Sequence, residues 1–234
     1  MSRSVLITGG NRGIGLATAR RFAELGDRVA ITHRTGAAPA GLMAVTCDVT
    51  DTAQVDQAFK EVEEAHGPVE VLVANAGITR DGLLLRMDDD ALTSVIDTNL
   101  IGPVRVARRA LKGMLRAKGG RIVLISSTVA MRGEVGQSNY AASKAGLIGL
   151  ARSLAREYGS RGITVNVVAP GLTDTDMAQQ LSEDQRAALI EQIPLRRMAA
   201  PPEIAATVAF LASAEASYIT GAVIPVDGGG GMGH

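Results

Sequence analysis

Short hydrophobic runs rich in Val and Ile alternate along the chain with longer stretches in which apolar residues recur three and four positions apart. The short runs predict buried strands at 5–7, 28–32, 43–46, 69–73, 121–125, 164–168 and 222–226. The longer stretches predict helices at 13–25, 52–65, 88–117, 139–158 and 201–213. Asp51-Thr52 and Pro201-Pro202-Glu203 are typical of the first turns of two of these helices.

The alternation of strands and helices predicts an α/β fold with right-handed crossovers. The predicted strands are apolar on both sides, as burial between two helical layers requires. We therefore expect a doubly wound Rossmann fold, with a seven-stranded parallel sheet covered by helices on both faces. Because no repeat, low-complexity tract or Pro, Gly and Ser linker divides the chain, we expect one nucleotide-binding domain over residues 1–234.

Composition narrows the class of protein. Of the 234 residues, 46% are hydrophobic and 21% are charged, which argues against disorder. The formal net charge is zero, so we expect no nucleic-acid partner. Cys47 is the only cysteine, which excludes an intrachain disulfide and a thiolate metal cluster and indicates a reducing, cytoplasmic compartment. The sequence shows neither a signal-peptide pattern nor a hydrophobic run long enough for a membrane span.

A glycine-rich turn follows the first predicted strand, in the segment VLITGGNRGIGLATARRFAELG at 5–26. Gly9 suits a sharp turn, Gly13 lets the main chain approach a pyrophosphate, and Gly15 lets the helix pack close to the sheet. The helix N-terminus adds free N–H groups and a partial positive charge. The pattern predicts a site for nucleotide phosphates, and the alternative is a turn with a structural role only.

Two arginines near this turn indicate which nucleotide binds. A cofactor without a 2′-phosphate usually meets an Asp or Glu about 20 residues beyond the glycines. Arg34 stands there instead, in AITHRTG, and Arg12 lies within the glycine turn. Two guanidinium groups can hold a phosphate through charge-assisted hydrogen bonds, so we predict NADPH rather than NADH. The alternative is that Arg34 is a solvated loop residue.

Three residues near the ends of later strands have two interpretations each. Asp48 can accept a hydrogen bond from an adenine amino group, or it can cap the helix that begins nearby. Asn75 belongs to a small-residue turn that permits close approach of a cofactor, or it stabilises the sheet. We interpret Cys47 as a small buried strand residue rather than a reactive thiol.

The segment SNYAASKAG at 138–146 places Tyr140 and Lys144 on one face of a predicted helix. The small residues around them keep that face clear for a flat ligand. A lysine about 5 Å away, at an effective dielectric of about 20, stabilises a phenolate by roughly 3 kcal/mol and lowers its pKa toward neutrality. Such a phenol is suited to general acid catalysis. The alternative is an ordinary amphipathic helix with a half-buried tyrosine and a surface lysine.

A serine favours the catalytic interpretation. Ser127 closes the predicted strand in RIVLISSTVA at 121–130, at the same carboxyl edge of the sheet as the glycine turn. It can hydrogen-bond the carbonyl oxygen that Tyr140 protonates. The neighbouring Ser126 fits the same spacing, and the sequence leaves this choice open.

Together these motifs resemble the short-chain dehydrogenase/reductase family over essentially the whole chain. The matching segments are T-G-x-x-x-G-x-G at 8–15, NAG at 75–77, DTNLIG around Asn99, Ser127, YAASK at 140–144 and APGLTDTDM at 169–177. VNVVAPG and SYITGAVIPVDGG narrow the resemblance to the 3-oxoacyl-acyl carrier protein reductases of type II fatty acid synthesis, and the sequence looks closest to the branch known from mycolic acid synthesis. The resemblance implies an enzyme that reduces 3-oxoacyl-acyl carrier protein to the 3-hydroxyacyl form.

The resemblance also implies roles for individual residues. NADPH supplies the hydride for the C3 ketone, Tyr140 protonates its oxygen and Ser127 orients it. Lys144 binds the nicotinamide ribose and lowers the Tyr140 pKa, and Asn99 holds a water for proton resupply, or alternatively marks a helix bend. Thr173 contacts the nicotinamide amide. The expected cofactor-binding residues are Gly9, Asn11, Arg12, Gly13, Ile14, Gly15, Arg34, Asp48, Val49, Asn75, Ala76, Gly77, Tyr140, Lys144, Pro170, Gly171 and Thr173.

The substrate side is expected to involve the amphipathic stretch after Thr175, which would lie over the site as a mobile lid. Met131, Met177 and Leu181 could line an apolar slot for the acyl chain. Arg132 near the site mouth is unexpected for very long chains, so the sequence supports no conclusion on chain length.

Partners follow from the resemblance. Lys118 and Arg161 match a basic pair that docks the acidic acyl carrier protein, and the alternative is two solvated loop charges. Family members are tetramers through helices that correspond to 99–117 and 139–158, although the sequence does not exclude a dimer. Other functions left open are reduction of another ketone, such as acetoacetyl-CoA, a quinone or a steroid, and non-catalytic nucleotide sensing.

Overall fold

A single seven-stranded sheet organises the structure, a computed structural model that describes residues 2–176 and 178–232. Its strands are β1 (Ser4–Thr8), β2 (Arg28–His33), β3 (Met43–Thr46), β4 (Val71–Ala74), β5 (Gly120–Ile125), β6 (Ile163–Pro170) and β7 (Val223–Val226). Every neighbouring pair is parallel, and the strand order is β3-β2-β1-β4-β5-β6-β7. The order reverses between β1 and β4, where doubly wound sheets bind ligands. The predicted α/β Rossmann fold is confirmed.

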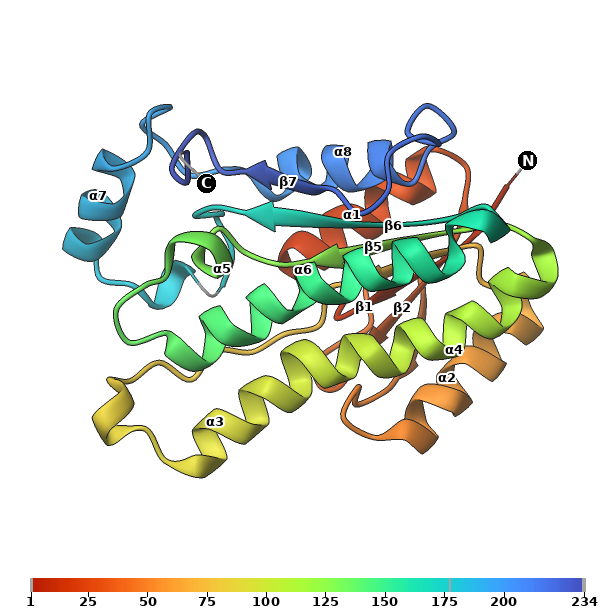
Figure 1. Cartoon of the computed structure of the whole chain (residues 1–234), viewed down its shortest axis with the longest axis horizontal. Coiled ribbons are helices and arrows are strands. Elements are labelled where there is room, and N and C mark those ends of the chain that lie inside the picture. The colour runs from red at the N-terminus through yellow and green to blue at the C-terminus, as the bar shows by residue number, and fades with distance from the viewer. Residues whose placement is uncertain (1, 177, 233–234) are drawn as a thin grey trace.

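Helices cover both faces of this sheet (Figure 1). One face carries α1 (Gly13–Glu24) and α8 (Pro201–Leu211), which pack against each other. The other face carries α2 (Thr52–His66), α4 (Gly102–Ala117) and α6 (Ser138–Tyr158). Among the residues that the structure describes, no helix is both long and apolar enough to cross a membrane.

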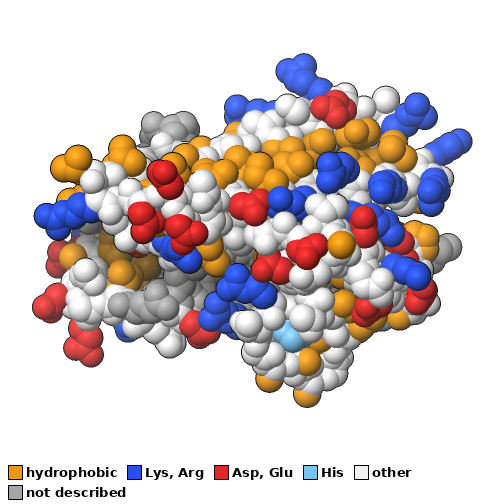
Figure 2. Space-filling view, turned by 90° about the horizontal axis from the view of Figure 1, so that it is seen from below, with side chains coloured by type: hydrophobic (Ala, Val, Ile, Leu, Met, Phe, Trp, Pro, Cys, Tyr) orange, Lys and Arg blue, Asp and Glu red, His pale blue; other side chains and the backbone are white. Residues whose placement is uncertain are grey.

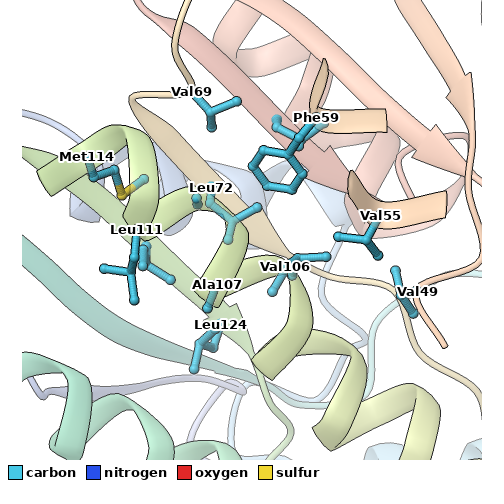
Figure 3. Close-up of a cluster of buried hydrophobic side chains, with 14 of the residues drawn as sticks. Val49, Val55, Phe59, Val69, Leu72, Val106, Ala107, Leu111, Met114 and Leu124 are labelled. Atoms are coloured by element: carbon cyan, nitrogen blue, oxygen red, sulfur yellow. The ribbon is translucent and has the colours of Figure 1, made fainter. Parts of the chain in front are cut away.

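The larger hydrophobic core lies between the sheet and the α2, α4 and α6 layer. Figure 3 shows Phe59 and Val55 of α2 facing Val106 and Leu111 of α4, with Leu72 of β4 in the middle of the cluster. These side chains are at most 6% exposed, and such burial contributes roughly 1.5–3 kcal/mol for each large side chain. The helix starts agree with the sequence, because Asp51 caps α2 by accepting hydrogen bonds from the N–H groups of Ala53 and Gln54.

The expected continuous helix at 88–117 is wrong in one respect. It consists of α3 (Asp89–Ile96), a π-helical turn η2 (Asp97–Ile101) and then α4. Five further short helices were not expected: η1 (Leu84–Arg86), α5 (Val129–Arg132), η3 (Gly159–Arg161), η4 (Ala178–Gln180) and α7 (Glu183–Glu191). They escape a search for hydrophobic periodicity because, of the five, only α7 exceeds four residues, and no side chain of α7 is buried.

Candidate active site

Tyr140, Lys144 and Ser127 meet at the carboxyl edge of the sheet, on the left in Figure 1. Tyr140 and Lys144 lie one turn apart on α6, and the Lys144 Nζ atom is 5.8 Å from the centroid of the phenol ring. The Nζ atom also donates to the carbonyl of Ile125 at 2.8 Å, at the end of β5. Ser127 lies close enough to the phenol to act on its pKa. The structure thus brings the predicted catalytic residues together.

The choice between the two serines is resolved by their hydrogen bonds. Ser126 Oγ donates to the carbonyl of Lys144 at 2.8 Å and is therefore turned into the packing between β5 and α6. Ser127 Oγ accepts from the N–H of Val129 at 3.2 Å and remains beside Tyr140. Ser127 is the serine in position to contact a substrate carbonyl.

The protonation of this pair differs from expectation. Burial raises the pKa of Tyr140, the hydrogen bond with Ser127 opposes that rise, and the charge of Asp81 adds to it. Burial lowers the pKa of Lys144 to about 8. The direction for Tyr140 is therefore opposite to the expected lowering of its pKa by Lys144, because burial is the largest effect on both groups.

Asn99 lies in the π turn η2 and is fully buried. Its Oδ1 atom accepts from the N–H of Ile78 at 2.8 Å, and its Nδ2 atom donates to the carbonyl of Ile78 and to Ser143 Oγ. A Cβ atom on Gly77 would lie 3.2 Å from Asn99 Oδ1 and 3.4 Å from Lys144 Nζ, so these two groups flank the same small space. Both interpretations of Asn99 agree with this geometry, because it sits at a helix irregularity and beside the lysine.

The glycine turn has the close contacts that a phosphate cradle needs. Gly9 has a φ of +65°, and a Cβ atom there would lie 2.9 Å from the Cα atom of Ala76. A Cβ atom on Gly15 would lie 2.2 Å from the carbonyl oxygen of Gly9, so a residue with a side chain does not fit at position 15. The side chain of the N-cap residue, Arg12, does not cap α1, so the first N–H groups of this helix can bind an anion.

Asn75 ties β4 to this turn. Its Nδ2 atom donates to the carbonyls of Thr8 and Gly9 at 3.0 and 2.9 Å, and its N–H donates to Thr8 Oγ1. These bonds give Asn75 the stabilising role left open by the sequence. The N–H of Ala76 also donates to Thr8 Oγ1, at 3.1 Å, so the NAG turn and the glycine turn form one unit.

The two predicted phosphate-binding arginines lie at this edge with exposed side chains. Arg34 Nη1 is 3.8 Å from Asp48 Oδ2, and Arg12 Nη1 is 3.5 Å from Asp176 Oδ2. Asp48 Oδ1 accepts from the N–H and the hydroxyl of Thr50 at 2.9 and 2.8 Å. The alternative role of Asp48 as a helix cap is wrong, because the neighbouring Asp51 caps α2.

The remaining predicted cofactor residues line the same edge or support it from behind. Asn11 donates to the carbonyl of Thr35 at 3.0 Å, and Ile14 packs on the α1 and α8 core. Val49 is only 5% exposed and belongs to the larger core. Beside it, burial and the charge of Asp48 raise the pKa of Cys47 to about 11, as suits an inert buried thiol.

The turn after β6 is tightly packed. The carbonyl of Pro170 accepts from the N–H of Thr128 at 3.0 Å, and a Cβ atom on Gly171 would lie 2.7 Å from the Cβ atom of Asp227. Thr173 Oγ1 donates to the carbonyl of Gly171 at 3.0 Å, and Thr173 is 6% exposed. This turn is held in place by β5 and β7 before any ligand binds.

Sequence reasoning missed the loop that borders the site opposite α7. Asp81 accepts from Gln137 Nε2 at 2.8 Å, and the N–H of Gly82 donates to the carbonyl of Gly136 at 2.8 Å. Asn139 Nδ2 donates to the carbonyl of Arg80 at 3.0 Å. These bonds fix the loop against the start of α6. The charged dipeptide that follows NAGIT was the available signal.

The expected substrate side is only partly described. Met131 and Leu181 are half-buried, and Met177 lies outside the described residues. Arg132 forms an ion pair of 2.8 Å with Glu134 on the loop that leads to Tyr140. A charged pair therefore stands on the loop beside the catalytic helix.

The predicted docking pair lies elsewhere. Gly162 follows Arg161 in the sequence, and a Cβ atom on Gly162 would lie 2.9 Å from the carbonyl oxygen of Lys118. The segments that carry the two basic residues are therefore close together. They precede β5 and β6, whereas Ser127 and Gly171 follow these strands. Because β6 has eight residues, roughly 25 Å separate the two edges. The pair therefore lies away from the candidate catalytic residues of its own subunit.

Fold and site together define a nucleotide-dependent oxidoreductase, with a phosphate cradle at the first turn and a tyrosine, lysine and serine at the same sheet edge. A family model described as enoyl-(acyl carrier protein) reductase matches residues 9–230, and the chain belongs to this family of short-chain dehydrogenases/reductases. Members of the family use a nicotinamide cofactor.

Three relatives cover nearly the whole chain. The 3-oxoacyl-[acyl-carrier-protein] reductase MabA of Mycobacterium avium is 56% identical over 234 residues, which is 100% of this chain and 92% of the relative. MabA of Mycobacterium tuberculosis strain H37Rv is 56% identical over 100% of this chain and 95% of its own. The 3-oxoacyl-[acyl-carrier-protein] reductase FabG of Escherichia coli K12 is 47% identical over 96% of this chain and 95% of its own.

Proposed function

We propose that this protein reduces 3-oxoacyl-acyl carrier protein to 3-hydroxyacyl-acyl carrier protein with NADPH, as a step of type II fatty acid synthesis. The observation that carries the proposal is the convergence of Tyr140, Ser127 and Lys144 at the edge of the sheet that holds the glycine turn. The identity of 56% to relatives named as such reductases supports the choice of substrate.

Each catalytic residue has a chemical task in this proposal. When bound, NADPH supplies the hydride that C3 of the substrate receives. Tyr140 donates its proton to the ketone oxygen, and Ser127 holds that oxygen by a hydrogen bond. Lys144 binds the nicotinamide ribose, and its cation favours the phenolate that remains after proton transfer. Asn99, buried beside Lys144, orders the water that returns a proton to the pair.

The preference for NADPH rests on two guanidinium groups and a missing carboxylate. Arg12 and Arg34 are both exposed at the edge where the nucleotide phosphates are expected. The acid that would bind a free 2′-hydroxyl is replaced by Arg34 after β2. Planar guanidinium groups bind phosphate in a bidentate manner, so they favour the 2′-phosphorylated cofactor.

Enoyl-acyl carrier protein reduction is a second candidate, because the matching family model carries that description. The geometry favours the 3-oxo substrate. A ketone oxygen that becomes an alkoxide needs a proton donor and a second hydrogen bond at one point, and Tyr140 and Ser127 supply both there.

An assay of NADPH oxidation separates these candidates. The purified protein would be given 3-oxoacyl and enoyl thioesters of increasing chain length, with acetoacetyl-CoA as the shortest substrate. We expect turnover of the 3-oxoacyl thioesters and loss of at least about 1,000-fold in kcat for Tyr140→Phe, with NADPH binding retained. Turnover of enoyl thioesters alone, or an active Tyr140→Phe enzyme, would contradict the proposal.

The proposal includes a homotetramer formed through α4 and α6. A groove of about 340 Å³ runs between these helices, and it is lined by Val104, Ala107, Arg108, Leu111, Lys112, Leu115, Leu150, Leu154 and Tyr158. Figure 2 shows a band of hydrophobic side chains across the lower face of the molecule, with Lys and Arg side chains gathered toward its right-hand end. A second subunit packed along α4 and α6 would cover the apolar part.

The remaining parts of the proposal concern the carrier protein, the chain and the compartment. Lys118 and Arg161 would attract the acidic carrier protein to the amino edge of the sheet.

Residues 1–234 would form one nucleotide-binding domain, which is supported by a single sheet whose strands run from Ser4 to Val226. A cytoplasmic location is supported by Cys47, the single cysteine, which is buried as a free thiol.

A further inference from the structure

Both arginines assigned to the 2′-phosphate face carboxylates in the protein alone. Arg12 Nη1 lies 3.5 Å from Asp176 Oδ2, and Arg34 Nη1 lies 3.8 Å from Asp48 Oδ2. The side chains of Arg12 and Asp176 are 72% and 61% exposed, so water can replace either partner at little cost. Arg12 therefore holds an exchangeable anion at the position expected for a cofactor phosphate.

The residue before Asp176 contacts the glycine turn. The Cγ2 atom of Thr175 lies 3.3 Å from the position that a Cβ atom on Gly13 would take. On the other side, the N–H of Asp174 donates to the carbonyl of Ala199 at 2.9 Å. The segment before Asp176 is thus anchored to the strand-like bridge at Ala199, and its end rests on the first turn of α1.

The second carboxylate is held differently. Asp48 receives two hydrogen bonds from Thr50 at 2.9 and 2.8 Å, and its side chain is only 27% exposed. It can stay in place when a ligand binds Arg34. Asp176 has an exposed carboxylate, and the described residues give it no hydrogen bond, so it is the member of the two pairs that can leave.

We propose that Asp176 is a resident counter-ion of Arg12 which the 2′-phosphate of NADPH displaces, so that Asp176 limits the affinity for phosphate-bearing nucleotides. This inference rests on the proposed cofactor site. A phosphate bound to Arg12 would place its negative charge close to the negative Asp176 carboxylate, and the two groups would repel each other at this range. NADH presents only a ribose hydroxyl there and leaves the Arg12–Asp176 pair intact. Asp176 is therefore a determinant of cofactor discrimination.

The direct test compares dissociation constants of NADPH and NADH for wild type and Asp176→Asn, measured by titration calorimetry at low ionic strength. We expect Asp176→Asn to bind NADPH about threefold to tenfold more tightly, and NADH within about twofold of wild type. The gain should shrink as salt screens the repulsion. Asp174→Asn is the matched control, because Asp174 is exposed two residues away and the described residues offer it no ion pair.

A second comparison asks whether the effect passes through Arg12. In an Arg12→Ala background, replacing Asp176 with Asn should tighten NADPH binding clearly less than in wild type, because the guanidinium for which the two anions compete is gone. An undiminished gain in that background would overturn the inference, since Asp176 would then act only as a distant charge.

The remaining outcomes are also decisive. An Asp176→Asn protein that binds both cofactors as wild type does, or tightens both equally, would overturn the role of Asp176 while leaving an NADPH-preferring enzyme intact. A gain of the same size in Asp174→Asn would overturn it as well. Wild-type protein that binds NADH as tightly as NADPH would overturn both the inference and the cofactor assignment on which it rests.

Discussion

The buried lysine is the costliest residue of the site. Lys144 is 4% exposed, and among the described residues no carboxylate forms an ion pair with it. Among the described residues its Nζ atom has one hydrogen bond, to the carbonyl of Ile125, although an ammonium group has three donors. A buried cation with spare donors opposes folding and suits a ligand with hydroxyl groups, such as a ribose.

Because Lys144 is buried, the free energy of unfolding should depend on pH. The folded pKa of Lys144 is about 8, below its unfolded value, so the unfolded state binds more protons between about pH 8 and 10.4 and stability rises with pH there. Lys144→Met should therefore be more stable than wild type at pH 7, and this advantage should fall by roughly 3 kcal/mol by pH 10.5. Urea unfolding at several pH values measures it.

A constant difference between the two proteins across this pH range would contradict the pKa assigned to Lys144. Lys144→Met should also lack reductase activity, so the comparison separates what the lysine does for catalysis from what it does to folding. Glu203 does not contribute in this pH range, because Arg197 holds its pKa at about 2.

The sequence predicted which residues form the site better than it predicted their pKa values. Spacing alone placed Tyr140 and Lys144 on one helix face and Ser127 at the same sheet edge. It gave the wrong direction for the Tyr140 pKa, because pairwise attraction is visible in spacing whereas burial depends on the surrounding fold. It also missed Asp81, whose approach to α6 depends on long-range loop packing.

At the scale of elements, the π turn η2 lets the helical run from α3 to α4 pack against two different helices. A π turn holds one more residue than α-helical geometry needs, and such turns are frequent at functional sites. Before it, α3 packs on α6, and after it, α4 packs on α2. The sequence predicted the whole run as one helix, because hydrophobic spacing tolerates a single extra residue and a local π turn leaves no signature in propensity.

One arginine adds polar contacts to the apolar packing between α2 and α4. Arg109 forms two hydrogen bonds with Glu63, of 3.0 and 2.6 Å, and its guanidinium lies 5.0 Å from the centroid of the Phe59 ring. We expect Arg109→Ala to lower the free energy of unfolding by about 1.5–3 kcal/mol, and Arg109→Lys by less. Denaturant unfolding measures both values.

Arg116→Ala is the matched control on the same helix, because Arg116 is exposed and the described residues give it no ion pair. Its change should stay within about 0.5 kcal/mol. Equal losses for Arg109→Ala and Arg116→Ala would contradict a specific contact of Arg109, and helix propensity would not explain them because Ala favours a helix more than Arg does.

At the scale of the whole molecule, the sheet separates the candidate catalytic residues from the proposed docking pair. The reacting groups lie at the carboxyl edge, and the basic pair Lys118 and Arg161 lies at the amino edge. The sequence placed each group correctly relative to its own strand. It did not reveal their separation, because the family resemblance attached the basic pair to the site without specifying which subunit it serves.

Docking of the carrier protein should depend on this edge. We expect the double variant Lys118→Glu, Arg161→Glu to lose roughly threefold to tenfold in kcat/KM for a 3-oxoacyl group on acyl carrier protein, because two attractions become repulsions. The same acyl group on CoA should be reduced within about twofold of wild type. NADPH oxidation measures both substrates.

The control is the double variant Arg20→Glu, Lys60→Glu, which changes the net charge equally at exposed positions of α1 and α2. If kcat/KM falls equally for the carrier-bound and the CoA-bound substrate in the Lys118 and Arg161 variant, the loss reflects damage to the enzyme and not to docking. If it falls for neither, the two residues are solvated loop charges.

The distance across the sheet has a consequence for assembly. A carrier protein seated on Lys118 and Arg161 has the full length of β6 between it and Tyr140 of the same subunit. Its acyl group would then enter the catalytic centre of a neighbour, and an isolated protomer would keep its chemistry but lose the delivery of carrier-bound substrate. Oligomerisation would be a working part of this enzyme and not merely a source of stability.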